Sequence, residues 1–265
     1  PNKKFPVAGS EVTDANVSVH ACCAPSSGSV TLRGTSASSA GIHAYNLTSG
    51  QFTHGKLLAG LPSNTINAFE TTGGITYIAT NVGIGRYDES RAEWLNPIST
   101  ANGLPSQIVE DLLLDPADSN LIWIATPAGL GMYNISSNIV TQTLTQQNAG
   151  MAGNSVWALT STVDLNGAST IFSAHDGAGS ERPGISEVDS ASTTVVDTHK
   201  FDQLPSNYVT ALTADWWGVH VATDAGPVTH WNSASGDFED GIANWQSGSW
   251  PIIEMYSDGD DLVAI

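Results

Sequence analysis

The feature that most restricts the fold of this chain is a sequence unit that recurs about every 45–50 residues. Four alanines mark equivalent positions, with spacings of 46, 49 and 48 residues: Ala79, Ala125, Ala174 and Ala222. A Leu-Pro-Ser-Asn segment, or a degenerate copy of it, precedes each alanine, at 61–64, 104–107, 151–154 and 204–207. Gly34 continues the register toward the start of the chain, and Ala264 continues it toward the end. Most of the chain therefore consists of copies of one structural unit.

Each unit contains four short segments with the pattern of β-strands, separated by small polar turns. In the unit that begins at 61, turns are expected at 71–74 and 81–83, and strands at 65–69, 75–80, 84–87 and 93–95. No segment shows a sustained helical period. Units of about 40–50 residues with four strands are typical of β-propellers, whereas β-helical solenoids, the alternative, have shorter repeats. We therefore predict an all-β protein, a β-propeller of four-stranded antiparallel blades.

The repeat boundaries predict a single propeller domain over 1–265, with five full blades and part of a sixth. The blades are expected at about 12–50, 61–95, 104–142, 151–195 and 204–240, with the partial one at 250–265. Five blades and a half do not close a ring, and Ile265 falls inside a predicted strand. We therefore expect the chain to be a fragment of a longer one.

The repeat resembles a known family. Leu-Pro-Ser-Asn-x-Val, then Asp-x-x-Gly, then Trp-Ile-Ala-Thr-x-x-Gly-Leu-x-x-Tyr is similar to the two-component regulator propeller repeat, of the seven-bladed-type, WD40/YVTN-like β-propeller superfamily. The resemblance covers about 12–265 and implies the setting of bacterial sensor ectodomains and of secreted or surface propellers. It also implies that the Leu-Pro-Ser-Asn loops share one face with the turns between second and third strands. Ligands of such folds bind on that face, but the resemblance does not identify the ligand.

Charge restricts the partners of the chain. The sequence has 8 Lys and Arg against 26 Asp and Glu, a formal net charge of −18. An acidic surface repels phosphate, so nucleic acid and anionic membranes are not expected as partners. No apolar run reaches the roughly 18–20 residues that cross a bilayer, so no membrane insertion by this segment is expected. We predict an extracellular or cell-surface location.

The repeat is broken most clearly at 175–183, where a turn of a few residues has grown by about six. This segment is expected to bring His175, Asp176, Glu181 and Arg182 to the ligand face. A lone cation in an acidic surface could fix a carboxylate or sulfate. The alternative is a solvated loop in which Arg182 pairs with Glu181 or Asp176 and contributes little energy.

A second break is the hairpin that contains Trp216 and Trp217, where other units carry small polar residues. Adjacent side chains on a strand point to opposite faces, so at least one of the two indoles is expected at the surface or against a neighbouring blade. An exposed Trp would suit stacking on a sugar ring or anchoring of a protein partner. Packing between blades is the alternative.

Catalytic, cofactor and metal motifs are absent from the sequence. It contains no nucleophile elbow, His-Glu-x-x-His, phosphate loop or Cys-x-x-Cys, and its seven histidines show no ligand spacing. Cys22 and Cys23 are adjacent, which does not suit a disulfide or a metal site on one strand. We therefore predict no cofactor and no metal site, and no catalytic residues are assigned. The spacing of carboxylate pairs is a three-dimensional quantity, so the sequence leaves glycosidic chemistry open.

Three Asn-x-Ser/Thr triplets are candidate glycosylation sites, at Asn46, Asn134 and Asn16. The first two occupy equivalent places at the end of a third strand, where a hairpin tip would tolerate a glycan. Asn16 is expected to be less accessible. The alternative is that each asparagine stabilises its turn.

These observations favour a non-catalytic extracellular β-propeller module that binds a glycan or a protein ligand. Two alternatives remain: a polysaccharide lyase or hydrolase on the same scaffold, and a structural surface or appendage subunit. In the latter, self-assembly would use the edges of blades.

Overall fold

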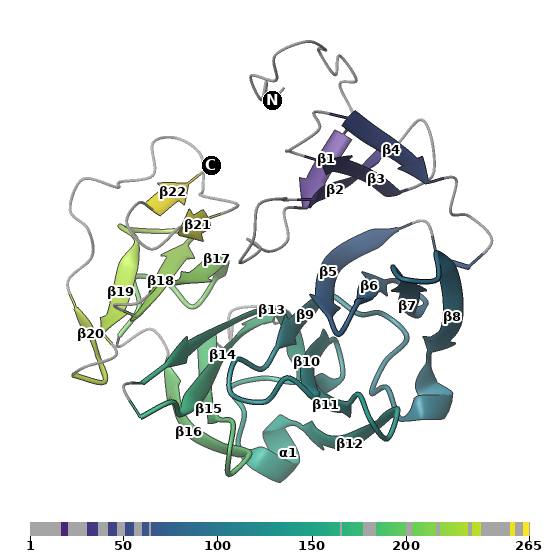
Figure 1. The fold of residues 1–265 in the computed structure, drawn as a ribbon. Coiled ribbons are helices and arrows are strands. Elements are labelled where there is room, and N and C mark those ends of the chain that lie inside the picture. The colour runs from purple at the N-terminus through teal and green to yellow at the C-terminus, as the bar shows by residue number, and fades with distance from the viewer. Residues whose placement is uncertain are drawn as a thin grey trace. The chain divides into compact units, whose positions relative to one another are not determined.

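The computed structural model describes the backbone of residues 17–20, 31–36, 42–46, 51–55, 60–63, 65–164, 166–176, 184–199, 203–215, 218–232, 235–239, 255–257 and 262–264. Side chains are described from residue 60 onward, except those of 256–257 and 262–264. The strands are labelled in Figure 1. The chain divides into two compact units, 1–99 and 100–265.

The first unit contains two four-stranded antiparallel sheets, each with its strands in chain order. One sheet consists of β1 (Val17–His20), β2 (Thr31–Ser36), β3 (Ile42–Asn46) and β4 (Gln51–Gly55), and the other of β5 (Ile66–Thr72), β6 (Ile75–Thr80), β7 (Gly83–Asp88) and β8 (Glu93–Ile98). β5 is longer than the sequence analysis expected because Gly73 and Gly74 both have positive φ, 58° and 76°, and form a two-residue turn.

The second unit contains three four-stranded antiparallel sheets and one two-stranded sheet, again in chain order. The strands are β9 (Asp111–Leu114), β10 (Leu121–Thr126), β11 (Gly129–Asn134) and β12 (Ile139–Leu144); β13 (Ser155–Val163), β14 (Ser169–Asp176), β15 (Gly184–Asp189) and β16 (Thr194–His199); β17 (Val209–Ala214), β18 (Gly218–Thr223), β19 (Thr229–Asn232) and β20 (Asp237–Glu239); and β21 (Met255–Ser257) and β22 (Leu262–Ala264).

Helix is confined, in the described part of the chain, to the single turns η1 (Thr100–Asn102) and α1 (Gln146–Ala149). The prediction of an all-β fold built from four-stranded antiparallel blades is confirmed: the described residues form five such sheets and the two-stranded sheet β21–β22. None of the described helices is long and apolar enough to cross a membrane.

The repeat alanines lie near the end of the second strand of four blades, on β6, β10, β14 and β18. All four are buried, and all six residues of β10 and of β18 are buried as well. A strand covered on both faces has this continuous burial, whereas the fourth strand of a blade, such as β12, is largely exposed. The small alanine side chain suits this covered position.

Neighbouring blades of the second unit pack face to face. The indole of Trp123, on β10, is fully buried among Val156, Ile171 and Val188 of the next blade. In the same way Phe172, on β14, packs edge to face on Trp231 of the blade after it, with ring centroids 4.7 Å apart. The first strands β9, β13, β17 and β21 contact one another in sequence. This is the packing of propeller blades.

Candidate functional site

The repeat provides an internal standard against which unusual residues can be recognised. Two positions before the repeat alanine, three blades carry a large aromatic side chain, at Tyr77, Trp123 and Phe172, and the fourth carries His220. Where a repeat departs from its own pattern, function is a better explanation than folding. A second departure follows the alanine, where three blades carry Thr and one carries His175.

The threonine at this second position closes the turn between second and third strands. Thr80 Oγ1 donates to Gly83 O, and Thr126 Oγ1 donates to Gly129 O, both at 2.7 Å. In the β13–β16 blade, the sequence between β14 and β15 is longer, at 177–183, and the position carries His175 in place of threonine.

His175 lies in the interior and holds β14 to β15. Its Nε2 is 2.8 Å from Ser186 Oγ and 3.2 Å from Ser173 Oγ, and the residue is 1% exposed. Burial lowers the pKa of His175 to about 4, so the imidazole is neutral at pH 7. These two hydrogen-bond contacts give His175 a structural role between β14 and β15.

Asp176 is exposed at the end of β14 and is the Cα partner of Ser155. In the neighbouring blade, Glu110 lies just before β9, half-buried, with its amide N–H bonded to Ala125 O at 2.9 Å. Burial raises the pKa of Glu110, and the negative charge of Asp176 raises it further. Two carboxyl groups from adjacent blades therefore influence each other at this end of the unit.

The other predicted site residues fall largely outside the described part of the chain. Glu181, Arg182, Trp216, Trp217 and Asn16 all lie there, as does the side chain of Asn46. Their ligand-binding and glycosylation roles stay predictions.

Asn134 is half-buried at the end of β11. Its Oδ1 accepts the backbone N–H of Ser137 at 2.8 Å, so the side chain stabilises the turn. Because a glycan would be attached to the amide nitrogen, this contact and glycosylation do not exclude each other. Glycosylation at Asn134 stays a prediction.

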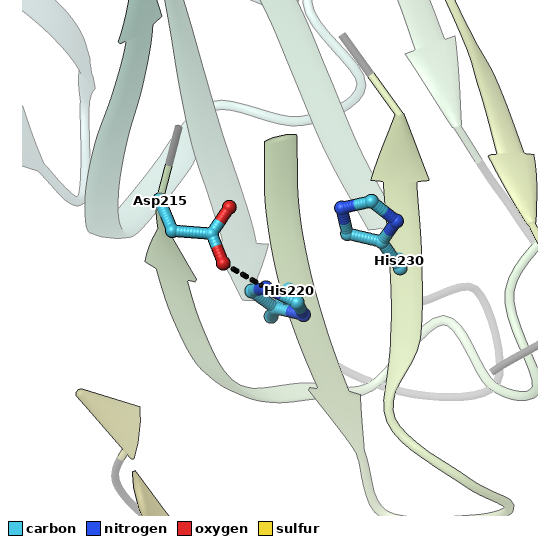
Figure 2. A group of neighbouring side chains, drawn as sticks. All are labelled: Asp215, His220 and His230. Carbon is cyan, nitrogen blue, oxygen red and sulfur yellow. Dashed lines mark hydrogen bonds and ion pairs between the residues drawn. The ribbon is translucent and has the colours of Figure 1, made fainter. Parts of the chain in front are cut away.

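A cluster of side chains of the types that bind metal ions lies in the β17–β20 blade, toward the end of the blade where β17 ends and β18 begins. His220 and His230 are directly opposite each other on β18 and β19, and Glu239 on β20 is opposite His230. Directly opposed residues in an antiparallel sheet place their side chains on one face. Asp215 follows β17 and reaches the same face, as Figure 2 shows.

The cluster is closely spaced. His220 Nε2 lies 2.7 Å from Asp215 Oδ2, and the two imidazole rings stack with centroids 4.7 Å apart. One potential ligand atom from each of Asp215, His220 and His230 lies within 4.8 Å of the other two. His230 Nδ1 is 3.8 Å from Glu239 Oε2 at the edge of the cluster.

The cluster is part-buried. His220 is 6% exposed, Asp215 and His230 are half-buried, and the face that carries His220 packs through Ala222 and Val228 against Met255 of β21. Burial lowers the pKa of His230, and a positive charge on His220 would lower it further. A neutral imidazole and an adjacent carboxylate are the ligand types that zinc and similar ions use.

A purely structural reading of the Asp215–His220 contact is supplied by the β9–β12 blade. There Asp115 occupies the place of Asp215, and its Oδ2 accepts Trp123 Nε1–H at 2.8 Å. An Asp that bonds to a second-strand ring is therefore a device of this repeat. What differs in the β17–β20 blade is that the ring is an imidazole and that a second imidazole lies against it.

The sequence analysis found no ligand spacing among the histidines because none exists along the chain: positions 215, 220 and 230 meet only through strand pairing. The signal that could have found them is the alignment of the repeats. His220 replaces an aromatic residue, and its cross-strand partner His230 stands where the β9–β12 blade has Met132.

Comparison with solved structures shows the β-propeller fold. The chain is similar to the extracellular domains of two hybrid two-component systems of B. thetaiotaomicron. It is 17% identical to that of BT3049, with a TM-score of 0.62 over 86% of this chain and 29% of that one. It is 15% identical to that of BT4673, with a TM-score of 0.67 over 96% of this chain and 31% of that one.

The WD40 domain of Neurospora crassa Pan2 is 11% identical, with a TM-score of 0.58 over 89% of this chain and 68% of that one. No protein-family profile matches the chain. No curated protein matches it either. These structural likenesses are consistent with the propeller-repeat resemblance in the sequence, and at such low identity they show the fold alone. The chain spans less than a third of either sensor domain.

Proposed function

We propose that this chain is part of an extracellular or cell-surface β-propeller that binds a ligand without catalysing its conversion. The location is supported by the fold likeness to two sensor ectodomains and by the net charge of −18. If the chain belongs to a larger sensor, its blades would bind the ligand that the sensor detects. A glycan is the ligand class that the described residues favour, and a protein surface is the alternative.

The observation that carries the proposal is the departure from the repeat at the end of β14. There the connection at 177–183 is enlarged, Asp176 is exposed, and Glu110 of the adjacent blade is within its electrostatic influence. Trp157, a half-buried bulge residue, lies two residues after the Cα partner of Asp176 and packs against the core that this blade forms with the next one. Carboxylates that accept hydrogen bonds from hydroxyl groups suit the recognition of a sugar.

The experiment is a glycan array followed by calorimetric titration of any glycan that is retained. Loss of a hydrogen bond to a charged group weakens binding about 10- to 100-fold, which is the effect expected for Asp176→Asn and Glu110→Gln. Asp197→Asn, an exposed carboxylate on the outer strand β16, is the matched control and should bind normally. Equal affinity in all three variants would refute this placement of the site. Retention of no glycan would leave a protein ligand as the alternative.

A second candidate function, glycoside hydrolysis or elimination, is favoured by the pair of carboxyl groups. A carboxyl group with a raised pKa beside an ionised one is the arrangement of a general acid and its partner. Product release from polysaccharides by the parent chain, abolished in Glu110→Gln, would select this function. Retention of a glycan without any turnover would reject it.

A further inference from the structure

We propose that Asp215, His220 and His230 bind one divalent transition-metal ion, for which zinc is the best match. The site is independent of the proposed ligand face, since it lies at the opposite end of its blade and uses none of the same residues. Imidazole nitrogen and carboxylate oxygen are favourable donors to zinc, and two imidazoles with one carboxylate form a recurrent protein ligand set.

The convergence of the donors is the first observation. Three separate segments of the blade, the end of β17, β18 and β19, bring one ligand atom each within 4.8 Å of the others. Donor atoms around a tetrahedral zinc ion lie about 3.3 Å apart, given bonds of about 2.0–2.1 Å. Small rotations of the side chains would close the cluster around an ion, and the strand pairing that positions them would be unchanged.

An unsatisfied nitrogen atom is the second observation. His230 Nε2 is buried and without a hydrogen-bond partner. A neutral imidazole carries one lone pair that needs a donor, and leaving it bare in the interior is unfavourable. Coordination of a metal ion would supply the partner that His230 Nε2 lacks, and on His220 the ion would replace the proton that Nε2 shares with Asp215.

The surroundings of His230 are arranged around its ring. A Cβ at Gly218 would lie 3.0 Å from His230 Nε2, so the absence of a side chain there keeps this nitrogen accessible to the cluster. On the other side of the ring, Glu239 Oε2 approaches Nδ1 at 3.8 Å. A carboxylate on the far nitrogen of a ligating histidine is the usual partner that orients the ring.

Comparison with the β9–β12 blade shows that packing does not require these residues. Along the equivalent row of that blade, Trp123, Met132 and Gln142 are opposite one another. A blade can therefore pack and hydrogen-bond without imidazoles in this row. The substitution of two neighbouring positions by histidine and of the third by glutamate converts this row into a metal-ligating one.

The test is titration of the chelator-treated full chain with Zn²⁺, in competition with a chromogenic chelator. Thiolates bind zinc, so the titration is run both in the parent chain and in a Cys22→Ser, Cys23→Ser background. We expect one Zn²⁺ per chain in that background and an unfolding midpoint that rises with Zn²⁺. Because changing an outer partner already costs about 10- to 100-fold, His230→Gln and Asp215→Asn should each weaken binding at least about 100-fold.

His199→Gln is the matched control, since His199 is a buried histidine bonded to Glu187 in another blade, and it should bind Zn²⁺ like the parent. Glu239→Gln alters an exposed side chain, should fold normally, and should bind about tenfold more weakly. The proposal is overturned if the Cys-free chain takes up no Zn²⁺, or if His230→Gln and Asp215→Asn bind it as the parent does. Should these two variants fail to fold, an unchanged affinity in Glu239→Gln, together with an unfolding midpoint of the Cys-free chain that Zn²⁺ does not raise, would overturn it equally.

Discussion

Asp115 provides a test of how neighbouring blades of the second unit are held together. The residue is 1% exposed, and its Oδ1 accepts the backbone N–H groups of Ala117 and Asp118 in the turn after β9. Its Oδ2 accepts Trp123 Nε1–H at 2.8 Å and the hydroxyl of Ser190, which belongs to the next blade. One carboxylate therefore joins a turn, a core indole and a neighbouring sheet.

Replacement of Asp115 by Ala should destabilise the protein by about 3 kcal/mol. Each buried donor left without its acceptor costs about 1–3 kcal/mol, and two donors, Trp123 Nε1 and Ser190 Oγ, lose the same acceptor. The two donors together would cost about 2–6 kcal/mol. Removal of the buried charge of Asp115 offsets part of this cost, so the expected value lies in the lower half of that range.

Asp164 is the matched control because it occupies the equivalent turn of the next blade. It is exposed, and its Oδ1 accepts the backbone N–H groups of Asn166 and Ala168 without reaching another blade. Asp164→Ala should therefore destabilise the chain less than Asp115→Ala does. The difference between the two variants isolates the contribution of the indole and inter-blade bonds.

The measurement is urea unfolding followed by tryptophan fluorescence, with the slope of the transition required to be the same in parent and variants. Ser190→Ala gives the inter-blade bond alone and should account for part of the loss. Equal destabilisation by Asp115→Ala and Asp164→Ala would refute the reasoning. It would mean that the turn contacts carry the whole effect and that the bonds to Trp123 and Ser190 contribute nothing measurable.

Three further outcomes follow from the described geometry. The pKa of His175 is about 4 when folded and near 6.5 when unfolded, so the unfolded chain binds the extra proton first and stability falls from pH 6.5 to pH 4. His175→Thr should remove up to about 3 kcal/mol of this loss, measured as the unfolding free energy at both pH values. Gly218→Ala would place its Cβ 1.8 Å from Trp231 O and should lower stability by about 2–4 kcal/mol, visible in the thermal midpoint. Expression in a glycosylating host should add a glycan mass at Asn134 that Ser136→Ala abolishes, and an unmodified asparagine would favour the turn role alone.

Repetition and local pattern were enough to predict the blades. The recurrence of Ala79, Ala125, Ala174 and Ala222 at near-constant spacing reflects a constraint that these four blades share, because the alanine position of each second strand is buried. The strand ends were less predictable: β5 extends to Thr72 because the turn that follows it has only two residues, Gly73 and Gly74, which their positive φ reveals. Periodicity defines which strands exist, and turn geometry defines where they stop.

The histidine cluster depends on information that the linear sequence does not display. Asp215, His220 and His230 are separated by 5 and 10 residues, a spacing with no meaning in a helix or a single strand. They meet because antiparallel pairing places His220 opposite His230 and because Asp215, just after β17, reaches the same face. The sequence contained the departure from the repeat, but the register that turns it into a cluster is a tertiary property.

The same division holds for the contacts between blades. The sequence alone could identify Asp115 as a turn residue, since Asp commonly caps the backbone of a turn. Its bond to Ser190, 75 residues away, and the influence of Asp176 on Glu110 exist only because separate sheets pack face to face. Short-range hydrogen bonds and strand periodicity depend on residues that are neighbours in the sequence, so the sequence predicts them. Burial and electrostatic coupling arise only when residues that are distant in the sequence share one low-dielectric interior.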